Sequence, residues 1–381
     1  MKLCDVTQFY SPVSGGVKRY LSEKKDYLLR ETDHEHVLII PGNKNECQER
    51  GRTKIHTIAS PQIEKTAGYR FLWNLPRLKK ILLQERPDVI ESGDPYQVGW
   101  KIAEVAEELN CKKVAFYHSH FPETYLTMLE SYVGKNLQDF LLDYAHHYAR
   151  RLYSRYDKTL VPSPLLRKIL EEWGITNTVD VKLGVNTDLL RPGMPPAEIR
   201  EKWKTRPDQI ILLSVGRLSP EKNITTLLKS FKILWEKFPD RFYLVIVGEG
   251  PLRVQVKEVL EKTNAITWYS YLDPKELVEI YRSADLFVHP GVCETFGLVT
   301  LEAQACGLPV VGIRGGFMDR LAFADSLSYW AIGNSAEALT EAIEKISRCN
   351  LKKMGKMASE VVHGKYSWNV VLKELFEIYE S

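Results

Sequence analysis

The fold is indicated most clearly by the stretch Pro290-Gly-Val-Cys-Glu-Thr-Phe-Gly-Leu-Val-Thr-Leu-Glu-Ala-Gln-Ala-Cys-Gly-Leu-Pro-Val-Val311. A short apolar run at 286–288 precedes it, and two valines close it, so the pattern predicts strand, loop, helix and strand in succession. We expect Gly297 to open the helix, and Gly307 with Pro309 to end it. This order is typical of an α/β sheet.

Two glutamates in this stretch are candidate ligand contacts. Glu294 is expected in the loop at the carboxyl end of a strand, and Glu302 follows on the helix after seven intervening residues. Open parallel sheets bind ligands at this edge, and a helix N-terminus there favours anions. The stretch alone is also compatible with a surface helix that carries two solvated glutamates.

Length and composition indicate an ordinary globular protein. With 381 residues, the chain is too long for one typical core, so two domains are expected. Hydrophobic residues make up 44% and charged residues 27%, and the net charge of +3 is too small to indicate a nucleic-acid partner. No apolar run reaches the length of a membrane span.

Cysteine usage and the first residues favour a cytoplasmic location. The six cysteines are scattered without a Cys-x-x-Cys pair, which argues against a disulfide framework or a zinc site. The segment Met1–Asp5 lacks the basic region and apolar core of a signal peptide. We therefore expect the cytoplasm, with attachment to the inner face of the membrane as an open possibility.

Strand-like runs alternate with longer helical patterns along the whole chain. This alternation predicts βαβ units and parallel sheets. Strands are expected at 3–9, 36–40, 54–58, 89–91, 113–117 and 159–161, and again at 210–215, 243–247, 286–288 and 309–312. Helices are expected at 17–30, 71–84 and 99–109, and again at 225–238, 253–262 and 275–282.

The rhythm of strands and helices restarts after a segment rich in turn formers. Glycine, asparagine and proline are concentrated at 182–196, which is typical of a linker between domains. We expect one Rossmann-like domain over residues 1–183 and a second over 184–366, facing a central cleft. A helical pattern at 367–381 is expected to pack back on the first domain.

Cations follow one strand of the second half. Arg217 and Lys222 lie in Ser214-Val-Gly-Arg-Leu-Ser-Pro-Glu-Lys-Asn223, between a predicted strand and a predicted helix. Arginine offers a planar fork and lysine a point charge to a diphosphate. The alternative is two solvated side chains on a loop. Asn223 suits an N-cap.

Two glycine turns follow other strands. Gly248 and Gly250 allow a backbone to approach a ligand, although a tight turn explains them nearly as well. Gly15 and Gly16 precede a helix, where exposed amides bind phosphate; a flexible loop is the alternative. Neither turn is the dinucleotide fingerprint, so a dehydrogenase is disfavoured.

Histidines and aromatic residues mark the first half. His118 and His120 follow a predicted strand, where they are placed to donate to a sugar hydroxyl or to direct a proton. The alternatives are metal binding and a purely structural role. Basic and aromatic residues form a face that suits anionic lipid, or a helix with a solvated basic side. These are Tyr69, Arg70, Phe71, Trp73, Arg77, Lys79, Lys80, His146, His147, Arg150, Arg151 and Arg155.

Taken in order, these motifs resemble the retaining glycosyltransferases of family 4, which have the GT-B fold. The resemblance rests on the Glu-x7-Glu pair, the Gly-Arg-x-x-x-x-Lys element, the Gly-x-Gly turn, the Gly-Gly loop, and the interdomain segment Gly184–Asp188. It covers nearly the whole chain. It implies transfer of a hexose from a nucleotide diphosphate sugar to a hydroxyl of a glycan or lipid-linked acceptor, without a cofactor or metal.

The resemblance also implies roles for individual residues. Catalytic roles are implied for His118, Arg217, Lys222 and Glu294, with the two cations stabilising the leaving diphosphate. Glu302 is expected to accept from both ribose hydroxyls, since a carboxylate suits a vicinal diol. The full set of expected donor contacts is Gly15, Gly16, Gly216, Gly248, Glu294, Phe296, Gly297, Leu298, Val299 and Glu302.

Substrate identity is less constrained by the sequence. The segment 117–122 resembles mannosyltransferases, which slightly favours GDP-mannose over a UDP-hexose. Residues 315–319 depart from the family's Gly-Gly-x-Pro-Glu pattern at the donor's distal contacts. The alternatives are an epimerase or hydrolase of the same fold that acts without an acceptor, and a non-catalytic sugar-nucleotide-binding protein.

Overall fold

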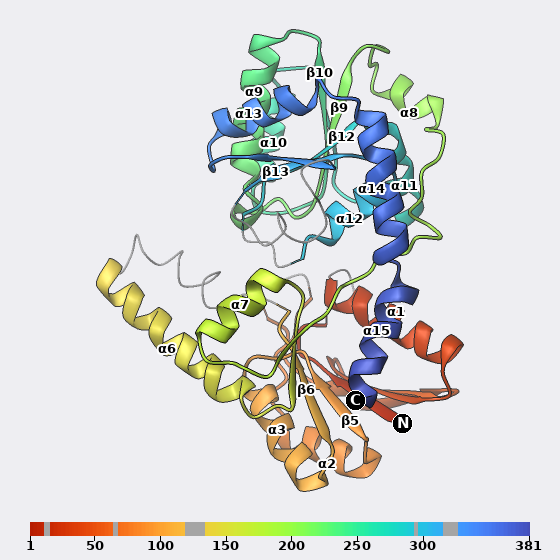
Figure 1. The fold of residues 1–381 in the computed structure, drawn as a ribbon, viewed down its shortest axis with the longest axis vertical. Coiled ribbons are helices and arrows are strands. Elements are labelled where there is room, and N and C mark those ends of the chain that lie inside the picture. The colour runs from red at the N-terminus through yellow and green to blue at the C-terminus, as the bar shows by residue number, and fades with distance from the viewer. Residues whose placement is uncertain (11–15, 64–67, 119–133, 293–295, 315–326) are drawn as a thin grey trace. The chain divides into compact units, whose positions relative to one another are not determined.

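The computed structural model divides into two compact units, each with its own sheet and helices (Figure 1). Unit 1 comprises Met1–Leu183 and Val371–Ser381, and unit 2 comprises Gly184–Val370. The residues that the structure describes are 1–10, 16–63, 68–118, 134–292, 296–314 and 327–381.

Unit 1 is built around an eight-stranded sheet in the order β3-β4-β2-β1-β5-β6-β7-β8. Neighbouring strands are parallel, except that β3 and β4 form an antiparallel pair at one edge. The strands are β1 Lys2–Val6, β2 Glu35–Gly42, β3 Glu46–Arg50, β4 Thr53–Ala59, β5 Val89–Ser92, β6 Lys112–Phe116, β7 Lys158–Val161 and β8 Thr178–Asp180. The inner strands β1, β2 and β5 are almost entirely buried, as expected for parallel strands that helices cover.

Local sequence signals set the helix boundaries of unit 1. Helix α2 begins four residues later than the sequence pattern predicts, because Asn74 caps it by accepting from the backbone N–H of Arg77 at 3.1 Å. The helices are α1 Gly16–Glu31, α2 Leu75–Glu85, α3 Gln97–Leu109, α6 Lys135–Tyr153, α7 Pro164–Glu172 and α15 Trp368–Glu380. Helix α15 belongs to this unit from Val371 onward and lies beside α1 (Figure 1), where the rings of Tyr27 and Phe376 are 5.5 Å apart.

Unit 2 has a six-stranded sheet in the order β11-β10-β9-β12-β13-β14, and every pair of neighbours is parallel. The strands are β9 Ile210–Val215, β10 Phe242–Val247, β11 Ile266–Tyr269, β12 Leu286–His289, β13 Val310–Ile313 and β14 Ser328–Ala331. All six residues of β10 are buried, so its continuous apolar run belongs to a strand in the middle of the unit.

The helix predicted after Gly297 is confirmed as α12. Gly297 stands at its N-cap with a φ of 72°, and Gly307 follows its end with a φ of 90°, both in the left-handed region that glycine adopts freely. The helices of unit 2 are α8 Ala197–Lys202, η2 Pro220–Lys222, α9 Ile224–Lys237, α10 Arg253–Leu260, α11 Pro274–Ser283, α12 Leu298–Ala305, α13 Ala336–Ile346 and α14 Leu351–Lys365.

Strand order reverses once in each sheet. Strand β1 has β2 on one side and β5 on the other, and β9 lies between β10 and β12. Doubly wound sheets bind their ligands outside the carboxyl ends of the strands at such a reversal. The predicted α/β class with two Rossmann-like sheets is confirmed, and these two edges are where the candidate residues are to be sought.

Candidate active site

Glycines allow two loops to pack together at the carboxyl edge of unit 2. Gly248, after β10, has a φ of 149°, and a Cβ added there would lie 1.8 Å from the carbonyl oxygen of Gly216. The backbone N–H of Gly216 donates to the carbonyl of Val247 at 2.9 Å. Close approach between the loops therefore explains why position 248 must be glycine.

Gly216 has different surroundings. Its φ is 154°, and no described heavy atom lies within 4 Å of the place where a Cβ would stand. Positive φ explains the glycine, and the place where a side chain would stand is open. A ligand backbone or phosphate can approach this position without meeting a side chain.

The predicted cations follow Gly216 on the loop between β9 and α9. Arg217 is extended into solvent, with 64% of its side chain exposed, and its Nε lies 3.9 Å from Glu221. An exposed pair at this distance contributes little to stability, so the guanidinium is available to an anion. Lys222 ends the short helix η2 and is partly exposed.

Asn223 fixes this loop to the end of a neighbouring strand. It stands at the N-cap of α9, but with a φ of 55° and without the side-chain cap that the sequence predicts. Its Nδ2 instead donates to the carbonyl oxygen of Pro290, after β12, at 3.0 Å and to Asn334 at 2.6 Å. These bonds hold the Lys222 loop against the carboxyl end of β12.

Glu302 lies on α12 and is 2% exposed. The hydroxyl of Tyr281, on α11, donates to its Oε2 at 3.1 Å. Tyr281 is fully buried, and sequence reasoning missed it because a tyrosine on the apolar face of a helix is usually a core residue. This hydrogen bond fixes the orientation of the Glu302 carboxylate.

The loop before α12 is partly described. Phe296 and Gly297 are buried, while Leu298 and Val299 begin the helix and are partly exposed. Their backbone amides belong to the first turn, where N–H groups lack partners within the helix. Glu294 lies outside the described residues, as do Gly15, His120 and the segment 315–319; Gly16 is exposed at the start of α1.

In unit 1, His118 follows β6 at the carboxyl edge of the sheet. Its ring stacks on Phe116, with centroids 3.9 Å apart and planes within 2°. A Cβ on Gly93, after β5, would lie 3.2 Å from this ring, so the glycine leaves room for it. Burial and the positive charge of Lys24 lower the pKa of His118 to about 3, so the imidazole is neutral near neutral pH.

Asp94 is a further candidate that sequence reasoning missed. It follows β5 directly after Gly93 and is 3% exposed; its Oδ1 accepts from the backbone N–H of Tyr96 at 2.7 Å. Its Oδ2 is buried without a hydrogen-bond partner among the described residues. Burial raises the pKa of Asp94 to about 7, which places its titration near neutral pH.

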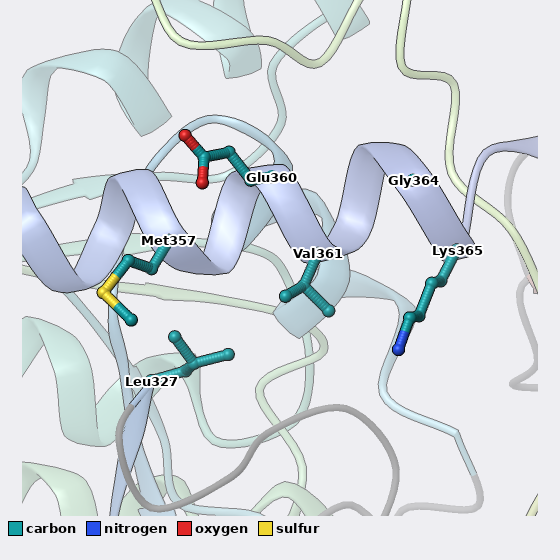
Figure 2. Close-up of a pocket in the computed structure, with 6 residues that line it drawn as sticks. All are labelled: Leu327, Met357, Glu360, Val361, Gly364 and Lys365. Atoms are coloured by element: carbon teal, nitrogen blue, oxygen red, sulfur yellow. The ribbon is translucent and has the colours of Figure 1, made fainter.

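A cavity of about 560 Å³ in unit 2 is separate from these residues (Figure 2). It is lined by Leu327, Met357, Glu360, Val361, Gly364 and Lys365, mostly from α14. Its lining is largely apolar and contains none of the motif residues. A nucleotide diphosphate needs several donors for its phosphates, which this lining does not supply.

Within the described parts of the chain, no cluster of three His, Cys, Asp or Glu side chains is placed to hold a metal ion. The helices among the described residues are also too short or too polar for a membrane span.

Comparison with solved structures identifies the fold. Sucrose-phosphate synthase from Thermosynechococcus elongatus is similar in structure over 100% of this chain and 98% of its own, with a TM-score of 0.80 at 20% identity. Two doubly wound units of this kind, matched over their whole length by that enzyme, have the GT-B fold.

Sequence comparisons identify the family. Residues 14–189 match the family described as Glycosyltransferase Family 4, and residues 196–361 match Glycosyl transferases group 1. A GDP-mannose-dependent alpha-(1-6)-phosphatidylinositol dimannoside mannosyltransferase of Mycobacterium tuberculosis is 30% identical over 91% of this chain and 87% of its own length. A GDP-mannose-dependent alpha-mannosyltransferase of Mycolicibacterium smegmatis is 28% identical over 100% of this chain and 97% of its own. The chain belongs to glycosyltransferase family 4 and is a hexosyltransferase.

Proposed function

We propose that this hexosyltransferase moves mannose from GDP-mannose to a hydroxyl of a glycan or glycolipid acceptor, with retention of the anomeric configuration. The observation that carries the proposal is the relationship to two GDP-mannose-dependent enzymes over nearly the whole chain. The glycosidic bond of the donor breaks, GDP departs, and the acceptor oxygen forms the new bond to the anomeric carbon.

Unit 2 holds the nucleotide in this proposal. Glu302 accepts hydrogen bonds from the ribose hydroxyls, in an orientation supported by the hydrogen bond from Tyr281. Arg217 and Lys222 face the diphosphate, whose charge grows as the bond to the sugar breaks, so fixed cations stabilise the transition state more than the ground state. The open space at Gly216 is compatible with a close approach of the phosphates.

The sugar is handled by His118 and Glu294. A neutral imidazole both donates and accepts a hydrogen bond, which suits a contact with sugar hydroxyls. Glu294 is assigned to the hydroxyls of the transferred hexose. Retention by double displacement needs a carboxylate close to the anomeric carbon, and we assign none. The acceptor therefore attacks from the face that GDP leaves, and the departing phosphate takes its proton.

The acceptor is proposed to lie at a membrane surface. Two of the basic residues expected to form a lipid-binding face are offset by acidic neighbours: Lys79 lies 2.6 Å from Glu108, and Arg155 lies 2.7 Å from Glu107. Trp73, before α2, is instead 66% exposed, and exposed indoles favour the membrane interface. We assign peripheral contact to the exposed indole of Trp73, rather than to a broad basic face.

Calorimetry with GDP, UDP and ADP tests the donor site. We expect GDP to bind in the micromolar range and Glu302→Gln to weaken it at least about tenfold, as for loss of hydrogen bonds to a charged group. Glu360→Ala is the matched control, because it removes an exposed carboxylate of the same unit from the cavity in Figure 2. If Glu360→Ala weakens the binding of GDP and Glu302→Gln does not, the donor site is misassigned.

Acceptor dependence tests the reaction. With GDP-mannose and octyl α-D-mannoside as a soluble acceptor probe, release of GDP is expected to rise with acceptor and to yield a disaccharide glycoside. Equal release of GDP and free mannose at every acceptor concentration would identify a hydrolase instead.

A further inference from the structure

A cluster of charged side chains is buried inside unit 1, between helix α1 and the sheet. Lys24, on α1, is fully buried, and its Nζ lies 2.6 Å from Asp5 and 3.0 Å from Glu91. Asp5 and Glu91 stand opposite each other on the neighbouring strands β1 and β5. His36, on β2, contacts the second oxygen of Asp5 at 2.7 Å.

Two tyrosines complete the cluster from the helices. Tyr379, on α15, accepts from the Nζ of Lys24 at 2.8 Å and donates a short hydrogen bond to Glu91. Tyr20, on α1, donates to Glu91 at 3.1 Å. A residue near the end of the chain is thereby tied to groups on α1 and on β5.

Stability alone does not account for this cluster. Buried charges lose their hydration, and apolar residues of similar volume usually stabilise a core as well or better. The charged groups are unequal: burial would raise the pKa of Asp5, but Lys24 and His36 hold that pKa below its usual value. Burial, with the charge of Asp5, raises the pKa of Glu91 despite Lys24. Neighbouring carboxyl groups whose pKa values are moved in opposite directions are typical of functional sites.

The cluster adjoins His118. The rings of Tyr20 and His118 meet edge to face with centroids 5.7 Å apart, and the ring of Tyr20 also contacts Phe116 at 5.1 Å. A cavity of about 10 Å³ is lined by Asp5, Glu91 and His118 together. The hydroxyl of Tyr20 is held by Glu91, so the ring that His118 meets is fixed by the cluster.

We propose that Tyr379 and Tyr20 are positioning residues for sugar transfer, because with Glu91 and Lys24 they fix the imidazole of His118 in the orientation that meets the sugar. This inference rests on the proposed role of His118. The last helix of the chain is then part of the support of the candidate active site, and the hydroxyls of the two tyrosines are the atoms that carry the effect.

NMR of the full chain labelled in histidine tests the orientation without any substrate. The His118 signal is assigned from its loss in His118→Asn, and it is displaced by the ring current of the stacked Phe116. We expect it to move in Tyr379→Phe and in Tyr20→Phe. Tyr27→Phe is the matched control, because Tyr27 is also on α1 and contacts α15 through Phe376 but is outside the cluster. An unmoved signal in both folded cluster variants overturns the inference.

Kinetics with GDP-mannose and octyl α-D-mannoside test the consequence. We expect each cluster variant to lower kcat about tenfold, as for one hydrogen bond to a charged group, with KM for GDP-mannose within about twofold. In a His118→Asn background, Tyr379→Phe is expected to have no further effect, whereas general damage would add to the loss. A moved signal with unchanged kcat, or fully additive losses, overturns the positioning role. Full activity of His118→Asn instead refutes the proposed role of His118 itself.

Discussion

The two glycines that end β9 and β10 give a matched pair of substitutions to alanine. Both have positive φ, 154° at Gly216 and 149° at Gly248, so alanine is strained at either position. They differ in their surroundings: a Cβ at 248 would lie 1.8 Å from the carbonyl oxygen of Gly216, whereas a Cβ at 216 meets no described atom within 4 Å. The comparison separates the cost of backbone strain from the cost of a steric clash.

The expected magnitudes follow from these two terms. Backbone strain of this kind costs on the order of 1–3 kcal/mol, so Gly216→Ala is expected to lose about 2 kcal/mol. Gly248→Ala adds an overpacking cost on the order of 1–3 kcal/mol, because one loop must move away from the other. For a unit of this size, 1 kcal/mol lowers Tm by roughly 2–4 °C, which predicts losses of about 4–8 °C and about 8–16 °C.

Scanning calorimetry measures the loss of Tm in both variants, and titration with GDP measures the affinity of the proposed donor site. Gly216→Ala is expected to weaken the binding of GDP, since its new methyl group enters the space assigned to the donor. It should nevertheless be more stable than Gly248→Ala. Equal losses of Tm in the two variants would refute the argument from close loop packing. Unchanged GDP affinity in Gly216→Ala would refute the assignment of that space to the donor.

Three further predictions concern other residues. Tyr281→Phe removes the hydroxyl that donates to Glu302. In the same calorimetric titration it is expected to weaken the binding of GDP about fivefold, less than Glu302→Gln does. Burial raises the pKa of Asp94 from 3.8 to about 7, so the folded protein retains a proton that the unfolded chain releases, and stability falls as pH rises between these values. Asp94→Asn should make the decline shallower without abolishing it, because the raised pKa of Glu91 adds a decline over the same range. Urea unfolding at about pH 5 and about pH 8 would reveal the difference, and a decline as steep as in the unsubstituted protein would contradict it. Trp73→Ala is expected to reduce sedimentation with vesicles of phosphatidylglycerol, whereas Tyr144→Ala, at an equally exposed aromatic residue, is not; equal losses would contradict the assignment.

Much of the fold follows from local sequence pattern. Buried parallel strands read as continuous apolar runs, so β9 and β10 are predicted to within one residue of their observed bounds. Strand β3 was missed because Glu46–Arg50 is polar and mostly exposed, and its pairing with β4 at an edge leaves no apolar period. Strand β8 has three residues, too few for a pattern.

The candidate site is less accessible to sequence reasoning, because partners distant in the chain create it. The motif around Glu302 is visible in the sequence, but its contact with Tyr281 comes from packing between α11 and α12. Lys24 resembles a solvated residue among the charges of α1, and only the approach of Asp5, Glu91 and Tyr379 makes it a buried cation. The roles of the motif residues toward substrate remain predictions.

The return of α15 to unit 1 has a consequence for synthesis on the ribosome. Residues 371–381 are translated after all of unit 2, yet they contribute Leu372 and Tyr379 to the buried interior of unit 1. While the chain emerges, α1 and the sheet therefore expose apolar side chains that α15 later covers, and Lys24 lacks its contact with Tyr379. Unit 2 is contiguous and is able to fold first, although it is made second. A nascent chain stalled before residue 371 is expected to recruit chaperones to its N-terminal half, and release of the last helix to end that association.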